Sequence, residues 1–272
     1  MRSVDDLCLL CLINPATKKN SHILPKFMTK SILGTSNQKA GYILQSLKPF
    51  DKSKVQDSPK EDFILCESCE RYFEILETYV SQRLHNRLWD IRKNSEFEDH
   101  INNDGIRWRS SKQININVFK LFLFSILWRS SVSSHPLFNL YKISEEEKDV
   151  FRTELIRFRV NQQKELLEKV DNDSTINIFY IILTCQSFGD ETKNVIFPYS
   201  NSGNPHSFYL NRYLIFFSFT NFSLNQFDFL VNSQNKNLNL GFLSPEFWQV
   251  FLDYLVAFYS KIAVENINPP SI

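Results

Sequence analysis

Cys8-Leu9-Leu10-Cys11 and Leu65-Cys66-Glu67-Ser68-Cys69 hold four of the five cysteines of this 272-residue chain, arranged as two CxxC pairs. A CxxC turn directs two thiolates at one ion, and two such pairs supply the tetrahedral sulfur ligands of a closed structural zinc site. The 54 residues between Cys11 and Cys66 exceed the spacing of a compact zinc ribbon, so we expect a folded segment between the pairs. The predicted ligands of a structural Zn²⁺ are Cys8, Cys11, Cys66 and Cys69.

The composition is that of a folded chain, with 43% hydrophobic and 14% aromatic residues and a net charge of +1. The charge is uneven, because residues 1–60 carry +6 and the rest of the chain carries −5. A positive N-terminal region is compatible with binding a phosphate backbone, although an ordinary lysine-rich surface has the same composition.

The apolar segments of the sequence do not point to a membrane. Residues 1–6 lack the basic segment and apolar run of a signal peptide, and the most apolar stretch, Val118 to Trp128, is shorter than the roughly 20 residues of a membrane span. We therefore expect a cytoplasmic protein that does not bind a membrane and whose thiols are reduced.

The hydrophobic patterns predict an α+β fold class, with an N-terminal metal-binding module followed by helices and a small antiparallel sheet. In the first part, Phe73, Leu76, Val80 and Leu84 recur on one face of a helix that we expect from Cys66 to about Lys93. Before this helix we expect a short strand running into a helix over 21–27 and a strand at 42–44. After it we expect a polar connector over 94–113 with a turn at 102–105, and helices over 115–131, 144–170 and 244 to about 264. The expected β segments are 176–185, 194–197, 208–219 and 227–231, with a turn at 201–205. The helix beginning at Ser144 opens with a capping box, Ser144 and Glu147.

The polar connector suggests a division of the chain. We predict a zinc-containing module over residues 1–93 and an α+β regulatory or partner-docking region over residues 114–272.

A histidine segment between the two CxxC pairs provides a second motif. Ser21-His22-Ile23-Leu24-Pro25 follows the first pair, and the apolar Leu65 leads through the second pair into the predicted helix. This order, over about residues 5–80, resembles the zinc-stapled subgroup of the HNH endonucleases. The resemblance implies a ββα-metal module, in which two short strands and a helix surround a divalent ion, and hydrolysis of phosphodiester bonds in DNA or RNA.

The resemblance also implies roles for individual residues. His22 would be the general base that takes a proton from the attacking water, which suits an imidazole because its pKa lies near working pH. A catalytic Mg²⁺ or Mn²⁺ would neutralise charge developing on the phosphate. Lys18, Lys19 and Lys26 flank His22 and would bind the nucleic-acid backbone. The alternatives for His22 are a structural histidine, or a zinc ligand in place of one cysteine.

Two positions depart from the family where the catalytic metal binds. Ser21 stands where relatives carry Asp before the base, and Glu70 follows the last CxxC where they carry His or Asn. A carboxylate ligates magnesium through oxygen, so Glu70, with Glu74 one turn on, is a candidate catalytic ligand. The alternative is a solvated acidic stripe.

One further motif lies outside this region. Trp108 stands between Arg107 and Arg109, a triplet that can stack a base and bind phosphates, or that simply packs at the surface.

Two functions follow from these patterns. The first is a metal-dependent endonuclease acting on nucleic acid, with DNA as the expected substrate; its long C-terminal region resembles those of antiviral defence effectors, and implies control by a protein partner or by homo-oligomer formation. The second is a catalytically degenerate zinc module that binds nucleic acid or protein. A transcription factor is disfavoured, because the net charge is near zero and no helix-turn-helix pattern is present.

Overall fold

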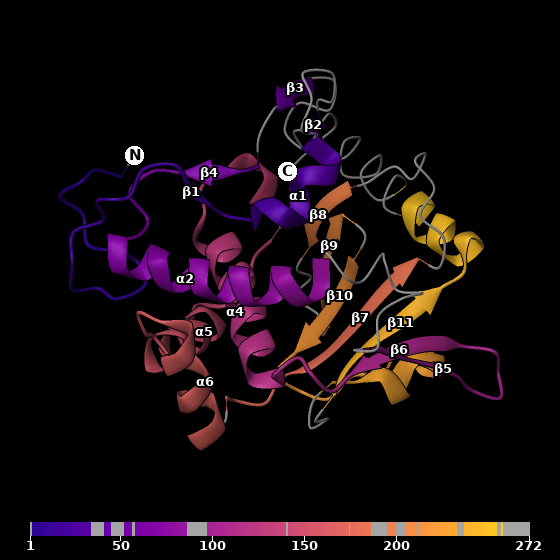
Figure 1. The fold of residues 1–272 in the computed structure, drawn as a ribbon. Helices are drawn as coiled ribbons and strands as arrows, with labels where there is room; N and C mark the ends of the chain where they lie inside the picture. Colours follow the sequence, from indigo (N-terminus) through magenta and orange to yellow (C-terminus); the bar gives the residue numbers. More distant parts are fainter. Residues whose placement is uncertain are drawn as a thin grey trace.

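A seven-stranded sheet with helices packed against it forms the body of the molecule (Figure 1). The computed structural model describes residues 2–33, 41–44, 52–55, 58–85, 97–139, 141–173, 175–185, 195–199, 205–211, 213–232, 237–254 and 257. The expected α+β class is confirmed. The elements, in chain order, are β1 (Ser21–His22), α1 (Lys26–Leu33), β2 (Gly41–Leu44), β3 (Lys52–Val55), β4 (Lys60–Glu61), α2 (Glu67–Val80), the π-helix η1 (Ser81–His85), β5 (Phe97–Ile101), β6 (Arg107–Ser111), α4 (Ile116–Val132), the 3₁₀-helix η3 (Pro136–Phe138), α5 (Glu145–Arg157), α6 (Gln163–Asn172), β7 (Phe179–Cys185), β8 (Val195–Tyr199), β9 (His206–Asn211), β10 (Tyr213–Ser218), the 3₁₀-helix η4 (Asn225–Leu230) and β11 (Leu238–Leu243).

The large sheet has the strand order β5-β6-β11-β7-β10-β9-β8. Its pairs are antiparallel except for β11 and β7, which run parallel. The sheet is therefore larger than predicted and mixed, because β11 is inserted between β6 and β7. Two further sheets have two strands each, β1 with β4 and β2 with β3.

The predicted connector over 94–113 was wrong in part, because it contains the edge hairpin of the sheet, β5 and β6. The expected turn is present: Asn102 Oδ1 accepts hydrogen bonds from the backbone N–H groups of Asp104 and Ile106, and Gly105 adopts a φ of 79°. The strands themselves are polar, and they pair through charges such as Lys112 with Glu98 at 3.1 Å. A solvated edge strand needs little apolar alternation, which explains the misassignment.

The long helices follow the sequence more closely. Asn115 caps α4 by accepting from the N–H groups of Asn117 and Val118, and the predicted capping box of Ser144 and Glu147 is present at α5. The single helix expected over 144–170 was wrong, because α5 ends at Arg157 and the φ of −98° and ψ of 7° at the following Phe158 leave the helical region. The chain resumes as α6 after residues 159–162.

The predicted β segment 208–219 is confirmed, and it forms the hairpin of β9 and β10. The segment 227–231 is largely the 3₁₀-helix η4, because the Asp228 carboxylate accepts from Leu224 N at 2.6 Å and from Ser223 Oγ at 2.7 Å and folds the chain back on itself. The predicted helix after Ser244 is present over 245–254, and its continuation, like the expected turn at 201–204 and residues 86–93, lies outside the described residues.

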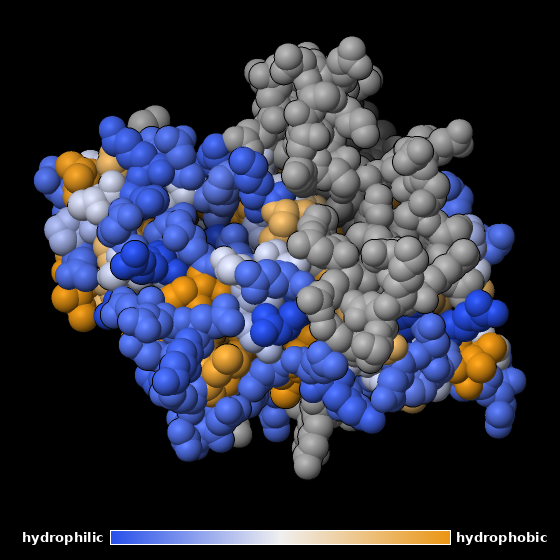
Figure 2. Space-filling model, viewed as in Figure 1, coloured by the Kyte–Doolittle hydropathy of each residue, from blue (hydrophilic) through white to orange (hydrophobic). Residues whose placement is uncertain are grey.

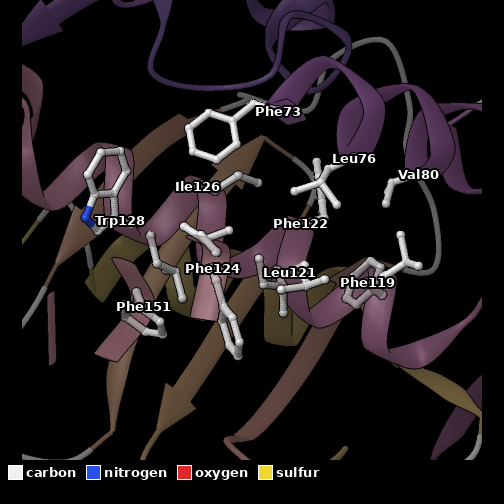
Figure 3. Packing of buried hydrophobic residues seen from close by; sticks show 14 of the residues in the cluster. Phe73, Leu76, Val80, Phe119, Leu121, Phe122, Phe124, Ile126, Trp128 and Phe151 are labelled. Atoms are coloured by element: carbon white, nitrogen blue, oxygen red, sulfur yellow. The ribbon is translucent and has the colours of Figure 1, made fainter. Parts of the chain in front are cut away.

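One continuous hydrophobic cluster joins the early and late parts of the chain. The predicted face of α2 is buried, and Figure 3 shows Phe73, Leu76 and Val80 directed toward the side chains of α4. Phe73 and Trp128 lie 6.2 Å apart between ring centroids, and Phe124 of α4 continues the cluster to Phe151 of α5 at 5.1 Å. Helix α4 is thus the central element that both α2 and the sheet pack against.

A smaller cluster covers the other face of the sheet, where Leu230 of η4 and Trp248 of the C-terminal helix pack on Ile181, Leu183 and Tyr209. The described part of the surface in Figure 2 is mostly hydrophilic with scattered apolar patches. Among the described residues, no helix combines the length and apolarity needed to cross a membrane.

The shared core predicts that residues 1–93 do not fold alone. Cutting the chain after residue 93 removes α4, so Phe73, Leu76 and Val80 lose the apolar surface that buries them and a small fragment is left with little core. Circular dichroism of the zinc-loaded fragment should show no cooperative thermal transition. The full chain melts cooperatively as the control, and a fragment with the melting temperature of the full chain would contradict the prediction.

Candidate functional site

The four predicted zinc ligands converge. The Sγ atoms of Cys8, Cys11, Cys66 and Cys69 all lie within 4.8 Å of one another, and all four residues are buried. The Sγ atoms of Cys11 and Cys66 are 3.8 Å apart. With Zn–S bonds of about 2.3 Å, the edge of a sulfur tetrahedron is also about 3.8 Å, so the cluster can bind a structural zinc ion.

Local hydrogen bonds shape the first CxxC turn. The N–H of Cys8 donates to Asn14 O at 2.8 Å, the N–H of Leu12 donates to Cys8 O at 2.9 Å, and Leu7 bridges to Pro15. Leu12 takes a φ of 55°, the left-handed conformation that lets the chain turn after the second ligand.

The second pair sits at the start of α2, where Cys66 precedes the helix and Cys69 lies in its first turn. Backbone bonds connect this segment to the first CxxC turn: Leu9 N donates to Ile64 O at 2.9 Å, and Lys18 N donates to Leu65 O at 3.0 Å. The two pairs are therefore held by one short backbone network, which explains how ligands so far apart in sequence meet.

The electrostatics of the cluster favour thiolates at some of its positions. The hydrogen bond from Cys69 lowers the pKa of Cys8 to about 5, and the same bond together with burial raises the pKa of Cys69. Arg159 Nη1 donates to Cys69 Sγ at 3.3 Å from the break between α5 and α6. Four thiolates around a Zn²⁺ ion would carry a net charge of −2, and Arg159 would offset part of that charge. No sequence pattern identified Arg159.

The chain leaves the first CxxC turn into β1, which pairs with β4 in the register Ser21 with Glu61 and His22 with Lys60. Two short strands followed by α2 appear in the order that a ββα arrangement requires, with α1, β2 and β3 inserted between the strands.

His22 is half-buried, and its Nδ1 is hydrogen-bonded to Ser58 Oγ. Directly paired residues of antiparallel strands point to the same side, so Lys60 lies beside His22. Ser58 and Lys60 were missed by sequence reasoning, since nothing in their spacing distinguishes them from the surrounding lysine- and serine-rich segment.

Ser21 and Glu70 lie on the inner side of β1. Both are buried, at 0% and 8% exposure, and Ser21 Oγ and Glu70 Oε2 have no well-formed hydrogen bond to any described residue. The pKa of Glu70 is raised, because burial penalises its charge more than the nearby Arg129 guanidinium and Ser21 hydroxyl favour it. Ser21 and Glu70 therefore place a hydroxyl and a carboxylate beside each other in a buried position.

Arg129 is the other buried charge here, at 1% exposure. Its Nη1 donates to the backbone oxygen of His22 at 2.6 Å, and its Nη2 pairs with Glu77 at 2.6 Å. Arg129 therefore ties α4 to β1 and α2. In the sequence, Arg129 stands out as the one arginine in a long apolar helix, and this pattern could have identified it as a functional or structural residue.

The predicted phosphate-binding lysines are dispersed. Lys18 pairs with Glu67 at 3.3 Å, Lys19 lies over the Phe63 ring at 5.5 Å, and Lys26 is exposed at the first position of α1. Glu74 is exposed and belongs to the solvated stripe.

A cavity of about 700 Å³ adjoins β4. Its lining combines basic and acidic residues around Lys60 and Glu61; the Glu61 carboxylate also accepts from Ser133 Oγ at 2.6 Å and Ser134 Oγ at 2.7 Å. It is a polar, solvent-accessible recess next to the strand pair that carries His22.

Comparisons with protein-family models, with curated proteins and with solved structures find no match to this chain. The site is therefore interpreted from its own geometry.

Replacing one ligand should abolish metal binding. Cys66→Ser leaves three thiolates, so the purified variant should contain no tightly bound zinc where the parent contains one per chain, and should lose about 3 kcal/mol or more of unfolding free energy. Inductively coupled plasma mass spectrometry and urea unfolding measure the two effects. Cys185→Ala, at the fifth cysteine, is the control and should retain one zinc. A Cys66→Ser variant with full zinc content would remove the assignment.

Proposed function

We propose that this protein is a metal-dependent, HNH-type nuclease in which His22 is the general base. The observation that carries the proposal is the position of His22. It lies on a two-residue strand anchored beside the four-cysteine cluster. Ser58 fixes the orientation of its ring, and Lys60 is its partner on the opposite strand. A general base must be within hydrogen-bond reach of the proton it takes, and the half-buried His22 ring, held by Ser58, suits this role.

The Ser58 contact assigns roles to the two ring nitrogens. When Nδ1 carries the proton and donates it to Ser58 Oγ, Nε2 keeps the lone pair that accepts the proton of an attacking water. Ser58 is then a positioning residue, because it acts on the substrate only through the ring it orients.

Basic residues around the strand pair suit a phosphodiester. Lys60 stands on the His22 side of the pair, and Lys18, Lys19 and Lys26 lie on the segments that enter and leave β1. A nucleic-acid backbone running past β1 would place its negative charges against these side chains.

The residues that would hold Mg²⁺ or Mn²⁺ are Ser21 and Glu70. The Ser21 hydroxyl lies beside the Glu70 carboxylate, and oxygen donors are what these ions prefer. When bound, the ion supplies charge neutralisation at the phosphate.

A second candidate function is nucleic-acid or protein binding without catalysis. Arg129, buried and near Glu70, already provides a positive charge at this position, and a cation beside the carboxylate opposes binding of a metal ion. Glu70 is a metal ligand if the chain is a nuclease, and it is not a metal ligand if the chain only binds nucleic acid or protein.

The setting is part of the proposal. Unregulated cleavage of DNA is toxic, so the helices and sheet that follow β4 would connect the nuclease to a protein partner or a second copy that controls it, as an antiviral defence effector requires.

Loss of the base should abolish cleavage. His22→Ala should reduce the rate of plasmid cleavage in Mg²⁺ or Mn²⁺ by about 100-fold or more, because general-base catalysis contributes about 10² to 10⁴. Gel electrophoresis measures the rate. Ser58→Ala should give a smaller loss together with a shifted pH profile, which a purely structural role would not produce. Retained cleavage by His22→Ala would reject the assignment, and a parent chain that binds plasmid without cutting it favours the second candidate.

Glu70→Gln distinguishes the two candidates by stability. The raised pKa means that Glu70 favours the folded state at low pH and loses this contribution as pH rises through the folded-state pKa, so the uncharged glutamine should be at least as stable as the parent at pH 8. Mg²⁺ at ten times its Kd should stabilise the parent by about 1.4 kcal/mol and leave the variant unchanged. Thermal denaturation measures both. Equal stabilisation of parent and variant would exclude Glu70 as a metal ligand, and Glu74→Gln, on the exposed stripe, is the matched control.

A further inference from the structure

A second polar cavity, of about 520 Å³, lies at the edge of the large sheet, where β5, β6 and β11 meet. In Figure 1 these strands are on the opposite side of the molecule from β1 and β4. The cavity is therefore separate from the His22 site. Its lining residues are Asp99, His100, Ile101, Arg107, Arg109, Phe242 and Pro245.

Strand register brings two arginines to this cavity. Arg109 pairs with Asp99 across the strands, and Arg107 pairs with both Ile101 and Phe242, so their side chains share one face of the sheet. Trp108 points to the other face, where it stacks on His100 at 5.0 Å between ring centroids. The triplet noted in the sequence is thus divided, and only its arginines face the cavity.

Arg109 is held in a defined orientation. Its Nε bonds to Asp99 Oδ1 and its Nη2 to Asp99 Oδ2 at 3.3 Å, while the guanidinium lies 5.3 Å from the centre of the Phe242 ring. Nη1 is buried without a hydrogen-bond partner among the described residues. The Asp99 side chain is 70% exposed and that of Arg109 only 13%, so an incoming anion reaches the Arg109 fork from the side that Asp99 occupies.

The other lining residues indicate which further chemical groups a bound anion would have. Arg107 is exposed and forms no ion pair within the described part of the chain, so a second guanidinium is available for the same group. Ile101, 60% exposed, and half-buried Phe242 give the cavity an apolar wall. Its volume lies in the range of small-molecule sites and exceeds what an inorganic anion fills.

We propose that this cavity binds a phosphate monoester with a flat apolar body, the chemistry of a nucleoside monophosphate. The phosphate accepts from Arg107 and displaces Asp99 from Arg109, and three phosphate oxygens suit two separate guanidinium groups better than a single carboxylate does. The apolar body lies against Ile101 and Phe242. Asp99 occupies the phosphate position in the ligand-free chain, so Asp99 and Arg107 affect binding in opposite directions.

Isothermal titration calorimetry of the full, zinc-loaded chain with adenosine 5′-monophosphate tests this proposal. One site should bind, with adenosine and inorganic phosphate each binding more weakly. Arg107→Gln should weaken binding about 10-fold, the value of one charge-assisted hydrogen bond, and Asp99→Asn should strengthen it. Lys112→Gln removes the same charge from an exposed position outside the cavity, and should change the affinity less than about twofold.

Several results would overturn the proposal: no binding by the parent chain, unchanged affinity in Arg107→Gln, weaker binding in Asp99→Asn, or phosphate binding as tightly as the nucleotide. His22→Ala should bind the nucleotide like the parent, which separates this cavity from the nuclease site. The result for the cavity is thereby independent of whether the chain cleaves nucleic acid.

Discussion

Convergence of four sulfur atoms is the constraint on which the N-terminal structure depends. Buried thiolates this close together repel one another, and the charge is tolerated only when shared with a proton, as between Cys8 and Cys69, or with a divalent ion. Because Cys66 and Cys69 begin α2, the same cluster fixes where that helix starts and where Glu70 points. The backbone bonds beside the cluster, such as Lys18 N to Leu65 O, set the path of the chain into β1 and so the place of His22.

The region around the cluster shares its hydrophobic core with the rest of the chain. Helix α2 buries its apolar face on α4, and Arg129 of α4 reaches the backbone of His22 and the carboxylate of Glu77. Arg159 contacts Cys69 from the segment after α5. Metal site, strand pair and sheet are therefore connected through a few long side chains, and a change in the later helices has a direct physical route to His22.

Much of this could be predicted from local sequence, and the rest could not for identifiable reasons. The CxxC spacing identified the metal ligands, and short-range chemistry identified the capping box at Ser144 and the buried face of α2. The hairpin of β5 and β6 was misassigned because its strands are polar and pair through charges. The break after α5 and the 3₁₀ turn at Asp228 depend on individual side-chain bonds. Ser58, Lys60 and Arg129 gain their importance only from distant partners, which periodicity does not reveal.

The remaining question at the site concerns the charge of Glu70. A buried carboxylate must be protonated, paired with a fixed cation, or bound to a metal ion, and each state has a different consequence for His22. All three nitrogens of Arg129 already donate, to Ser125 O, His22 O and Glu77, so Arg129 acts on Glu70 only through space. The Ser21 hydroxyl also favours the charge of Glu70, but burial outweighs both effects and keeps the pKa of Glu70 raised. In the proposed nuclease, a divalent ion beside Glu70 would favour the charged carboxylate at the cost of repulsion from Arg129, so the balance between these two cations would determine whether Glu70 binds a metal ion.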